Sequence, residues 1–300
     1  MHRFALIAVA VLVPAIARAI DTGPPADRAA FLAQQTINCR GCNLAGTNLD
    51  RRDLTGADLA GANLKGASFN RTILHGVNLA GADLAGVSLK RHDLAGANLA
   101  GASLTGASFH RAILRSADLS GADLTAANLN LAILTSAKLQ HASLVQALLF
   151  GIEAGGADFT EANLGAALMG SARLMASKLD RTDLSLADLW EARLNDASLR
   201  GATLTDANLH AASLLRADLH GVTGDRTNLT QALLHGANLS AAVLHAADFF
   251  QADLVEADLS GADLARARLS AAKLFNARTA GTRFDGATMP DGTAGQTEGK

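Results

Sequence analysis

Four arginines recur at one fixed interval in the first half of the chain, and their chemistry suits anion binding. They are Arg51, Arg71, Arg91 and Arg111. A guanidinium group donates paired hydrogen bonds to phosphate, sulfate or carboxylate. If the chain repeats its path at this interval, these side chains stack at about 4.8 Å per coil and form a ridge about 15 Å long. The alternative is a solvated edge, where arginines spread over the aliphatic parts of their neighbours. We call these four residues the arginine ridge.

Two cysteines are the other residues with distinctive chemistry. Cys39 and Cys42 are the only cysteines of the chain. In an exported protein such a pair forms a disulfide or packs as plain core residues. A redox-active pair is the alternative, although no thioredoxin-like βαβ pattern surrounds it. Covalent haem would require a histidine where Asn43 stands, and zinc would require two further ligands. We therefore expect no metal and no cofactor.

A strict period of five residues positions these side chains. From Leu44 to Met289 nearly every fifth residue is Leu or a similar apolar residue. The residue before it is often Asp or Asn, and the residue two before it is usually Ala, as in Ala122-Asp123-Leu124. We name the five positions of a unit alanine, Asx, central, first turn and second turn. A helix requires a period of 3.6 and a strand a period of 2. A period of five instead indicates stacked units that turn repeatedly and bury Leu and Ala together.

The tandem unit Ala-Asp/Asn-Leu-x-x resembles the repeat of the pentapeptide-repeat proteins, and the resemblance covers residues 37–289. It implies an all-β chain folded as a right-handed quadrilateral β-helix (β-solenoid). Four pentapeptide units would form each coil, which gives about 12 coils in the stack. The central residue and the Ala two positions before it would both face the core.

The charges of the last units provide an independent test of a coil of four units. Four consecutive units carry Asp at the Asx position, and the same position carries Arg or Lys four units later. The expected inter-coil ion pairs are Asp248 with Arg268, Asp253 with Lys273, Asp258 with Arg278, and Asp263 with Arg283. Coils of three or five units would separate these charges. Exposed pairs contribute only about 0.2–1 kcal/mol each, so we expect them to fix the last coils and not to form a site.

Residues 1–19 have the pattern of a secretory signal peptide. His2 and Arg3 precede an apolar run, and Ala17-Arg18-Ala19 has the small-x-small pattern of a cleavage site. The apolar run is shorter than the roughly 20 residues that span a bilayer. We expect cleavage after Ala19, a secreted or periplasmic protein, and no membrane span after cleavage. An uncleaved anchor is the alternative.

The two ends of the repeat should need covering, because the end of a solenoid exposes core side chains and unpaired backbone. Residues 20–36 are predicted as a linker and a short N-terminal capping helix. The helix would run from Ala26 to Gln35, with Phe31 over the first coil. Residues 290–300 are polar and Gly-rich, which predicts a disordered tail. The last coil could be covered by its own apolar residues or by a second copy in an end-to-end homodimer.

A few positions depart from the repeat. Arg52 and His92 occupy alanine positions, and we expect their side chains to swing out at the corner, because a buried charge is costly. Ala154 and Gly224 replace a central Leu, which predicts a bend or local softness. Trp190, the only Trp, occupies an outward position and is a candidate contact residue.

Several function classes can be weighed from these features. Nucleic acid is not an expected partner, because the formal net charge is −2 and no aromatic residues alternate with the ridge. An unbroken register leaves no loops to build a catalytic groove, so we expect no enzyme and no catalytic residues. We expect a non-catalytic exported scaffold or binding rod whose partner is a protein or an anionic envelope component. The resemblance also allows a DNA-mimicking topoisomerase modulator, which the signal peptide and the near-neutral charge disfavour.

Overall fold

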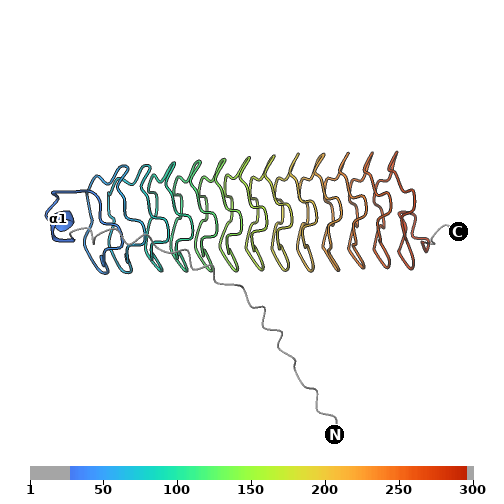
Figure 1. Ribbon diagram of the computed structural model, residues 1–300. Helices are drawn as coiled ribbons and strands as arrows, with labels where there is room; N and C mark the ends of the chain where they lie inside the picture. Colours follow the sequence, from blue (N-terminus) through green and yellow to red (C-terminus); the bar gives the residue numbers. More distant parts are fainter. Residues whose placement is uncertain (1–27, 296–300) are drawn as a thin grey trace, which may run out of the picture.

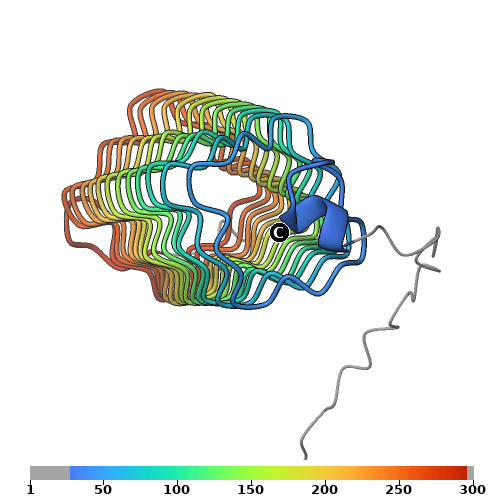
Figure 2. The ribbon, with the colours of Figure 1, turned by 90° about the vertical axis from the view of Figure 1, so that its left-hand side faces the viewer.

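The computed structural model describes residues 28–295 as an elongated stack of coils (Figure 1). Helix α1, Arg28–Leu32, is the one helix of this part. The coils contain no continuous strand within the described residues and are joined by isolated parallel β-bridges, such as Asn43 with Asn63 and Asn63 with Asp83. Each bridge joins a unit to the fourth unit after it, so one coil contains four five-residue units. Viewed along the axis, successive coils lie almost over one another (Figure 2).

A typical unit with Asp or Asn at the Asx position satisfies all five of its backbone N–H groups. Three donate to carbonyls of the adjacent coils, one closes a turn, and one donates to the Asx side chain. In the unit 122–126 the donors and acceptors are Ala122 to Leu119 O (3.0 Å), Asp123 to Ala102 O (3.0 Å), Leu124 to Ser143 O (2.7 Å), Thr125 to Asp123 Oδ1 (3.0 Å) and Ala126 to Val145 O (2.9 Å). Asp and Asn recur because their short side chains reach the N–H two residues on.

Side chains at the alanine and central positions form one continuous core. Leu124 is fully buried and Ala122 is 1% exposed, and this holds for nearly every unit. The larger central residues are phenylalanines, at Phe69, Phe109, Phe159, Phe249 and Phe284. Alanine fits its position because the chain turns there from one unit to the next, which leaves little volume for a side chain. The burial removes apolar surface from water along the whole stack, which is the main stabilising term.

Helix α1 lies over the first coil and covers its core (Figures 1 and 2). Phe31 is fully buried and Leu32 packs against the core. Arg52 holds the helix in place, because its guanidinium donates to the carbonyl oxygens of Phe31 (2.8 Å) and Leu32 (2.9 Å). A cation at the carbonyl end of a helix is favourable, because the last carbonyls lack partners within the helix. Arg28 adds a hydrogen bond to the Asn43 carbonyl oxygen at 2.6 Å.

The helix is shorter than the predicted Ala26–Gln35 segment. It ends at Leu32 and continues as a turn, while residues 26 and 27 lie outside the described residues. The same is true of the predicted signal peptide at 1–19, so the structure does not address it.

The C-terminal tail differs from the prediction of disorder at 290–300. Residues 290–295 turn back over the last coil, where Thr288 and Ala294 form an antiparallel bridge. Met289 N–H donates to the Thr293 carbonyl at 2.8 Å, and Gly295 N–H donates to the Ala287 carbonyl at 2.7 Å. The disorder prediction is wrong for this part because composition does not reveal that the free edge of the last coil offers hydrogen-bond partners. Residues 296–300 lie outside the described residues.

The predicted bends at Ala154 and Gly224 are not found. The β-bridges continue on both sides of each position. At Gly224 the missing side chain is replaced by Thr227, whose hydroxyl donates to the carbonyl oxygens of Leu204 (2.9 Å) and Gly224 (2.7 Å). A neighbouring polar residue therefore fills the space that a central Leu leaves.

The ladder is instead interrupted nearer the N-terminus. Within the described coils two successive bridges are absent, although bridges flank them on both sides. The absent pairs are Ser68 with Ser88 and Ile73 with Asp93. His92 occupies an alanine position at this point, and its Nε2 lies 2.6 Å from the Phe69 carbonyl oxygen. We attribute the interruption to the imidazole, which is larger than the Ala that normally fills this position.

The first prediction concerns the cap. Phe31→Ala should lower the free energy of unfolding by about 3 kcal/mol, because a fully buried aromatic ring is lost. Urea unfolding measures the change, and hydrogen exchange should show the loss of protection in the first coil. Phe275→Ala is the control, because Phe275 is 71% exposed and its loss should change stability by less than about 0.5 kcal/mol. Equal effects of the two substitutions would contradict a capping role for α1.

Candidate anion-binding ridge

The arginine ridge occupies one corner of successive coils, at the second turn position. All four side chains are exposed, and the backbone there has φ between 59° and 61°. All the remaining second turn positions between residues 41 and 111 are Gly. The left-handed conformation costs a residue with a side chain roughly 1–2 kcal/mol, and Gly avoids this cost. The backbone therefore gives no reason for arginine at these four positions.

The acids beside the ridge do not neutralise it. Asp50 and Asp53 bind local donors, Asn70 and Thr55 respectively. The side-chain hydrogen bond from Asn70 lowers the pKa of Asp50, and that from Thr55 lowers the pKa of Asp53. Asp93 accepts a hydrogen bond from a backbone N–H and, within the described coils, forms no ion pair with an arginine. Among residues 28–295 none of the four ridge guanidinium groups makes a hydrogen bond or an ion pair, although the charge of Arg51 contributes to lowering the Asp50 pKa.

Three of the four arginines at the same position farther along the chain behave differently, whereas the fourth, Arg266, has Ala246 at the matching position of the preceding coil and forms no ion pair among the described residues. Each of the three has an acid at the matching position of the preceding coil and forms an ion pair with it. The pairs are Arg181 with Glu161 (2.6 Å), Arg216 with Asp196 (2.7 Å) and Arg226 with Asp206 (2.5 Å). The hydrogen bond from Arg216 lowers the pKa of Asp196, and that from Arg226 lowers the pKa of Asp206. In the ridge, therefore, the matching position of the preceding coil carries another arginine instead of the partner acid.

The two unusual alanine-position residues do not swing outward as predicted. Arg52 and His92 are half-buried and point along the stack to backbone carbonyl oxygens. Thr72 and Thr182, also at alanine positions, donate to the carbonyl oxygens of the central residues Leu49 and Phe159 on the preceding coil. His92 contacts the corresponding oxygen. The prediction failed because these carbonyl oxygens are available inside the corner, and a polar side chain there finds a partner without leaving it.

The Asp and cation pairs of the last coils lie together. The separations are 3.2 Å for Asp248 with Arg268, 3.9 Å for Asp253 with Lys273, 3.6 Å for Asp258 with Arg278 and 2.6 Å for Asp263 with Arg283. Burial raises the pKa of Asp263, but hydrogen bonds from His245 and the Ala265 N–H, with the charges of His245 and Arg283, lower it overall. The cations of these pairs are exposed and the aspartates only partly buried, so each pair contributes little to stability.

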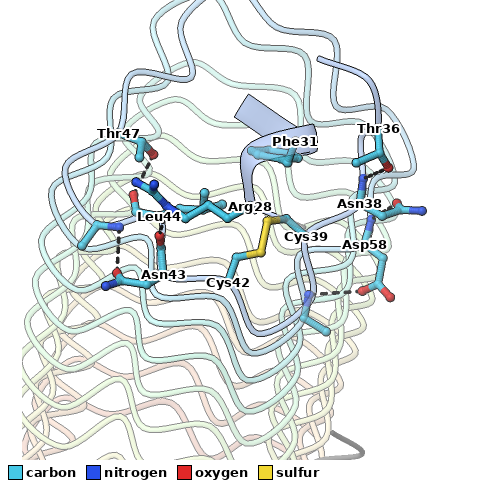
Figure 3. The surroundings of a disulfide bond; sticks show 12 residues. Arg28, Phe31, Thr36, Asn38, Cys39, Cys42, Asn43, Leu44, Thr47 and Asp58 are labelled. Atoms are coloured by element: carbon cyan, nitrogen blue, oxygen red, sulfur yellow. Dashed lines mark hydrogen bonds between the residues drawn. A yellow bond between two sulfur atoms is a disulfide. The ribbon is translucent and has the colours of Figure 1, made fainter. Parts of the chain in front are cut away.

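Cys39 and Cys42 form a disulfide in the first coil, directly under the cap. Figure 3 shows Phe31 lying beside the sulfur atoms, with Arg28 reaching across to the next corner. Both cysteines are buried, and the bond restrains the coil on which α1 rests. The structure gives the pair a structural position and no exposed thiol.

Apolar residues on the same corner were missed by the sequence analysis, which singled out Trp190 alone. Phe150 and Trp190 stack with their ring centroids 6.2 Å apart. Leu131 and Leu168 are exposed nearby. The signal was present in the sequence as spacing, because Phe150 and Trp190 are two coils apart with Gly170 between them.

Residues 28–295 contain neither a metal-binding cluster of side chains nor a membrane-spanning helix. In that range no group of three or more His, Cys, Asp or Glu side chains could hold a metal ion. No helix there is long and apolar enough to cross a bilayer.

The sequence model described as "Pentapeptide repeats" matches the chain in eight copies. They cover residues 37–76, 53–91, 93–130, 112–149, 155–190, 187–223, 225–255 and 252–289. The chain belongs to the pentapeptide-repeat family. Members of this family fold as right-handed β-helices, and the bridged coils of this pentapeptide-repeat protein are those of a β-helix.

Similar solved structures come from several organisms. HetL, a pentapeptide repeat protein involved in heterocyst differentiation regulation from the cyanobacterium Nostoc sp. strain PCC 7120, is 31% identical over 89% of this chain and 97% of its own, with a TM-score of 0.24. A pentapeptide repeat protein from the Arabidopsis thaliana thylakoid lumen is 29% identical over 42% of this chain and 67% of its own, with a TM-score of 0.23. QnrB1, a plasmid-mediated fluoroquinolone resistance protein, is 18% identical over 68% of this chain and 89% of its own, with a TM-score of 0.27. No curated protein matches the chain.

The second prediction follows from the strained backbone of the ridge. Arg111→Gly should raise the free energy of unfolding by about 0.5–1 kcal/mol, because it relieves the left-handed conformation and part of the like-charge repulsion. Arg226→Gly is the matched control, with φ of 57° instead of 59°. Arg226→Gly relieves the same backbone strain but loses the ion pair with Asp206, so it should raise the free energy of unfolding by less than Arg111→Gly does. Urea unfolding compares them, and a loss of stability in Arg111→Gly would contradict the strain argument.

Proposed function

We propose that this protein is a non-catalytic exported repeat scaffold whose arginine ridge binds an anionic component of the cell envelope. The partner is a molecule that presents phosphate, sulfate or carboxylate groups, which guanidinium groups bind in pairs. The scaffold supplies a rigid row of these groups at a fixed spacing of about 4.8 Å, so little conformational freedom is lost on binding.

The observation that carries this proposal is the contrast between the ridge and the paired arginines. At Arg181, Arg216 and Arg226 an acid on the preceding coil neutralises the charge. At the ridge four like charges stack without partners among the described residues, in a conformation that Gly adopts at lower cost. Folding alone favours Gly or a paired charge at these positions. An external anion would supply the missing partner.

The absence of catalysis is part of the proposal. The repeat register runs unbroken from Leu44 to Met289, so the described coils carry no inserted loop around which a catalytic groove could form. Many of the acids bind backbone N–H groups or cations on neighbouring coils, and their recurrence reflects the repeat.

The finer architecture that we propose is a four-sided, right-handed stack of about 12 coils, roughly 60 Å long at about 4.8 Å per coil. An end-to-end homodimer through the C-terminal coil is also part of the proposal. Phe275 is 71% exposed on that coil, whereas the opposite end is covered by α1.

The third prediction tests the ridge with a defined anionic matrix. At neutral pH a protein of formal net charge −2 should be retained on phosphocellulose only through a local cluster of cations. We expect retention at low salt, released as ionic strength rises. The variant Arg71→Gln, Arg91→Gln, Arg111→Gln should elute at clearly lower salt.

The control for this test removes the same charge from the same backbone position. The variant Arg181→Gln, Arg216→Gln, Arg226→Gln loses three guanidinium groups that are already paired. It should elute close to the unmodified protein. Equal elution of the two triple variants, or no retention of the unmodified protein, would overturn the proposed function of the ridge.

The fourth prediction concerns export. Full-length chain expressed in a Gram-negative host should be recovered from the periplasm with a mass that corresponds to a first residue of Ile20, because the small-x-small pattern ends at Ala19. Arg18→Pro together with Ala19→Leu should block processing and serve as the control. A full-length mass in the cytoplasm would contradict both cleavage and export.

A further inference from the structure

The corner that carries the arginine ridge continues into a row of apolar side chains. Backbone hydrogen bonds connect the two parts coil by coil. They run from Arg111 N–H to Asn130 O (3.0 Å), from Leu131 N–H to Phe150 O (2.9 Å), from Gly151 N–H to Gly170 O (3.0 Å) and from Ser171 N–H to Trp190 O (2.8 Å). At about 4.8 Å per coil the combined feature extends roughly 30 Å along one corner. We call Leu131, Phe150, Leu168 and Trp190 the apolar edge.

Two glycines give the apolar side chains their places. Trp190 lies across Gly170, where an added Cβ would clash with the indole ring. Leu131 lies over Gly151, where an added Cβ would approach its Cδ2 to 2.9 Å. Trp190 extends over Gly170 to stack with Phe150. The apolar side chains are therefore packed against the corner in fixed positions.

These side chains remain accessible although they are packed. Leu131 is 37% exposed, Phe150 45% and Leu168 48%. Leu168 lies on the flank of the same corner, bridged to Leu148 on the coil before it. Contiguous exposed apolar residues on a soluble chain mark sites of contact with another molecule or with a membrane.

We propose that this corner binds the surface of an anionic phospholipid bilayer, with the arginine ridge on the lipid phosphates and the apolar edge inserted at the headgroup level. This inference rests on the proposed function and names the partner of the ridge. Basic residues near an anionic membrane each add to the affinity, and apolar residues add to it by burial. Trp is enriched where membrane and water meet, because its ring is apolar and its N–H is polar.

The shape and chemistry of the corner favour a bilayer over other anionic partners. The apolar edge projects from a convex corner, so it suits a soft apolar phase into which side chains can insert. Half of the apolar edge, Leu131 and Leu168, is aliphatic. A sugar or a base would stack only on the rings of Phe150 and Trp190, whereas hydrocarbon can contact all four side chains. A bilayer offers phosphates and hydrocarbon over the whole length of the corner, whereas an acidic protein would need both surfaces in matching order.

The fifth prediction is tested with vesicles of two compositions. The chain from Ile20 onward, which retains every described residue, is mixed with phosphatidylcholine vesicles or with vesicles that also contain phosphatidylglycerol. We expect co-sedimentation with the anionic vesicles, at least about tenfold stronger than with the neutral ones. Trp190 is the only Trp, so a blue shift of its fluorescence reports insertion of the apolar edge directly.

Two variants separate the contributions of charge and apolar contact. The Arg71→Gln, Arg91→Gln, Arg111→Gln variant should bind anionic vesicles at least about tenfold more weakly, because three charges are lost. The Leu131→Ser, Phe150→Ser, Leu168→Ser variant should also bind at least about tenfold more weakly, while keeping its retention on phosphocellulose.

Each variant has a matched control from another part of the stack. Arg181→Gln, Arg216→Gln, Arg226→Gln removes three paired charges. Met175→Ser, Leu186→Ser, Leu233→Ser removes three apolar side chains with exposures of 38%, 64% and 44% that lie outside the arginine ridge and the apolar edge. Both controls should bind anionic vesicles like the unmodified protein.

The outcomes distinguish this inference from the proposed function on which it rests. Retention on phosphocellulose without vesicle binding, or vesicle binding unaffected by the three Ser substitutions, would overturn the membrane inference and leave the anion-binding ridge in place. The first result would indicate an acidic protein or glycan as the partner, and the second would indicate binding through charge alone. Loss of retention on phosphocellulose in both Arg triple variants alike would overturn the ridge itself. Binding to neutral and anionic vesicles alike would also contradict the inference.

Discussion

The hydrogen-bond ladder between coils is the constraint on which the rest of the structure depends. A pentapeptide unit satisfies all of its backbone N–H groups only when a neighbouring coil lies on each side of it. Any inserted residue would leave donors unpaired and shift every later side chain out of its position. The strict register of the sequence follows from this constraint, as does the single narrow core of Leu, Phe and Ala along the axis.

The same ladder converts sequence spacing into surface columns. Residues at the same position of successive coils lie directly above one another, so the residues at a spacing of 20 decide which side chains meet on the surface. Where acids and bases alternate, as at Asp196 and Arg216, the column forms ion pairs. Where arginines repeat, repulsion and backbone strain accumulate without a partner among the described residues. Where glycine alternates with an aromatic residue, as at Gly170 and Trp190, the ring occupies the space that the glycine leaves open. A column is thus the unit of recognition in this fold.

The ends of the stack require separate solutions, because there the ladder has no next coil. At the first coil Phe31 fills the end of the core and Arg52 satisfies the last carbonyls of α1. The disulfide restrains the coil beneath. At the last coil the chain reverses and residues 293–295 cover part of the free edge. A one-dimensional core gains stability from each neighbouring pair of coils, so these end contacts limit fraying of the whole stack.

The sequence by itself determined the repeating unit, its register and the inward positions of Leu and Ala, because a strict period of five has few physical solutions. It also contained the coil length, since the acids of 248–263 and the cations of 268–283 lie within ion-pair distance in the structure. It did not determine that Arg52 and His92 turn inward, that the ladder opens beside His92, or that residues 290–295 return to the last coil. Those depend on carbonyl oxygens and volumes that exist only after the coils are stacked. The tertiary structure alone decided that Trp190 lies across Gly170 and packs against Phe150, because such contacts depend on side-chain conformations that exist only after the coils are stacked.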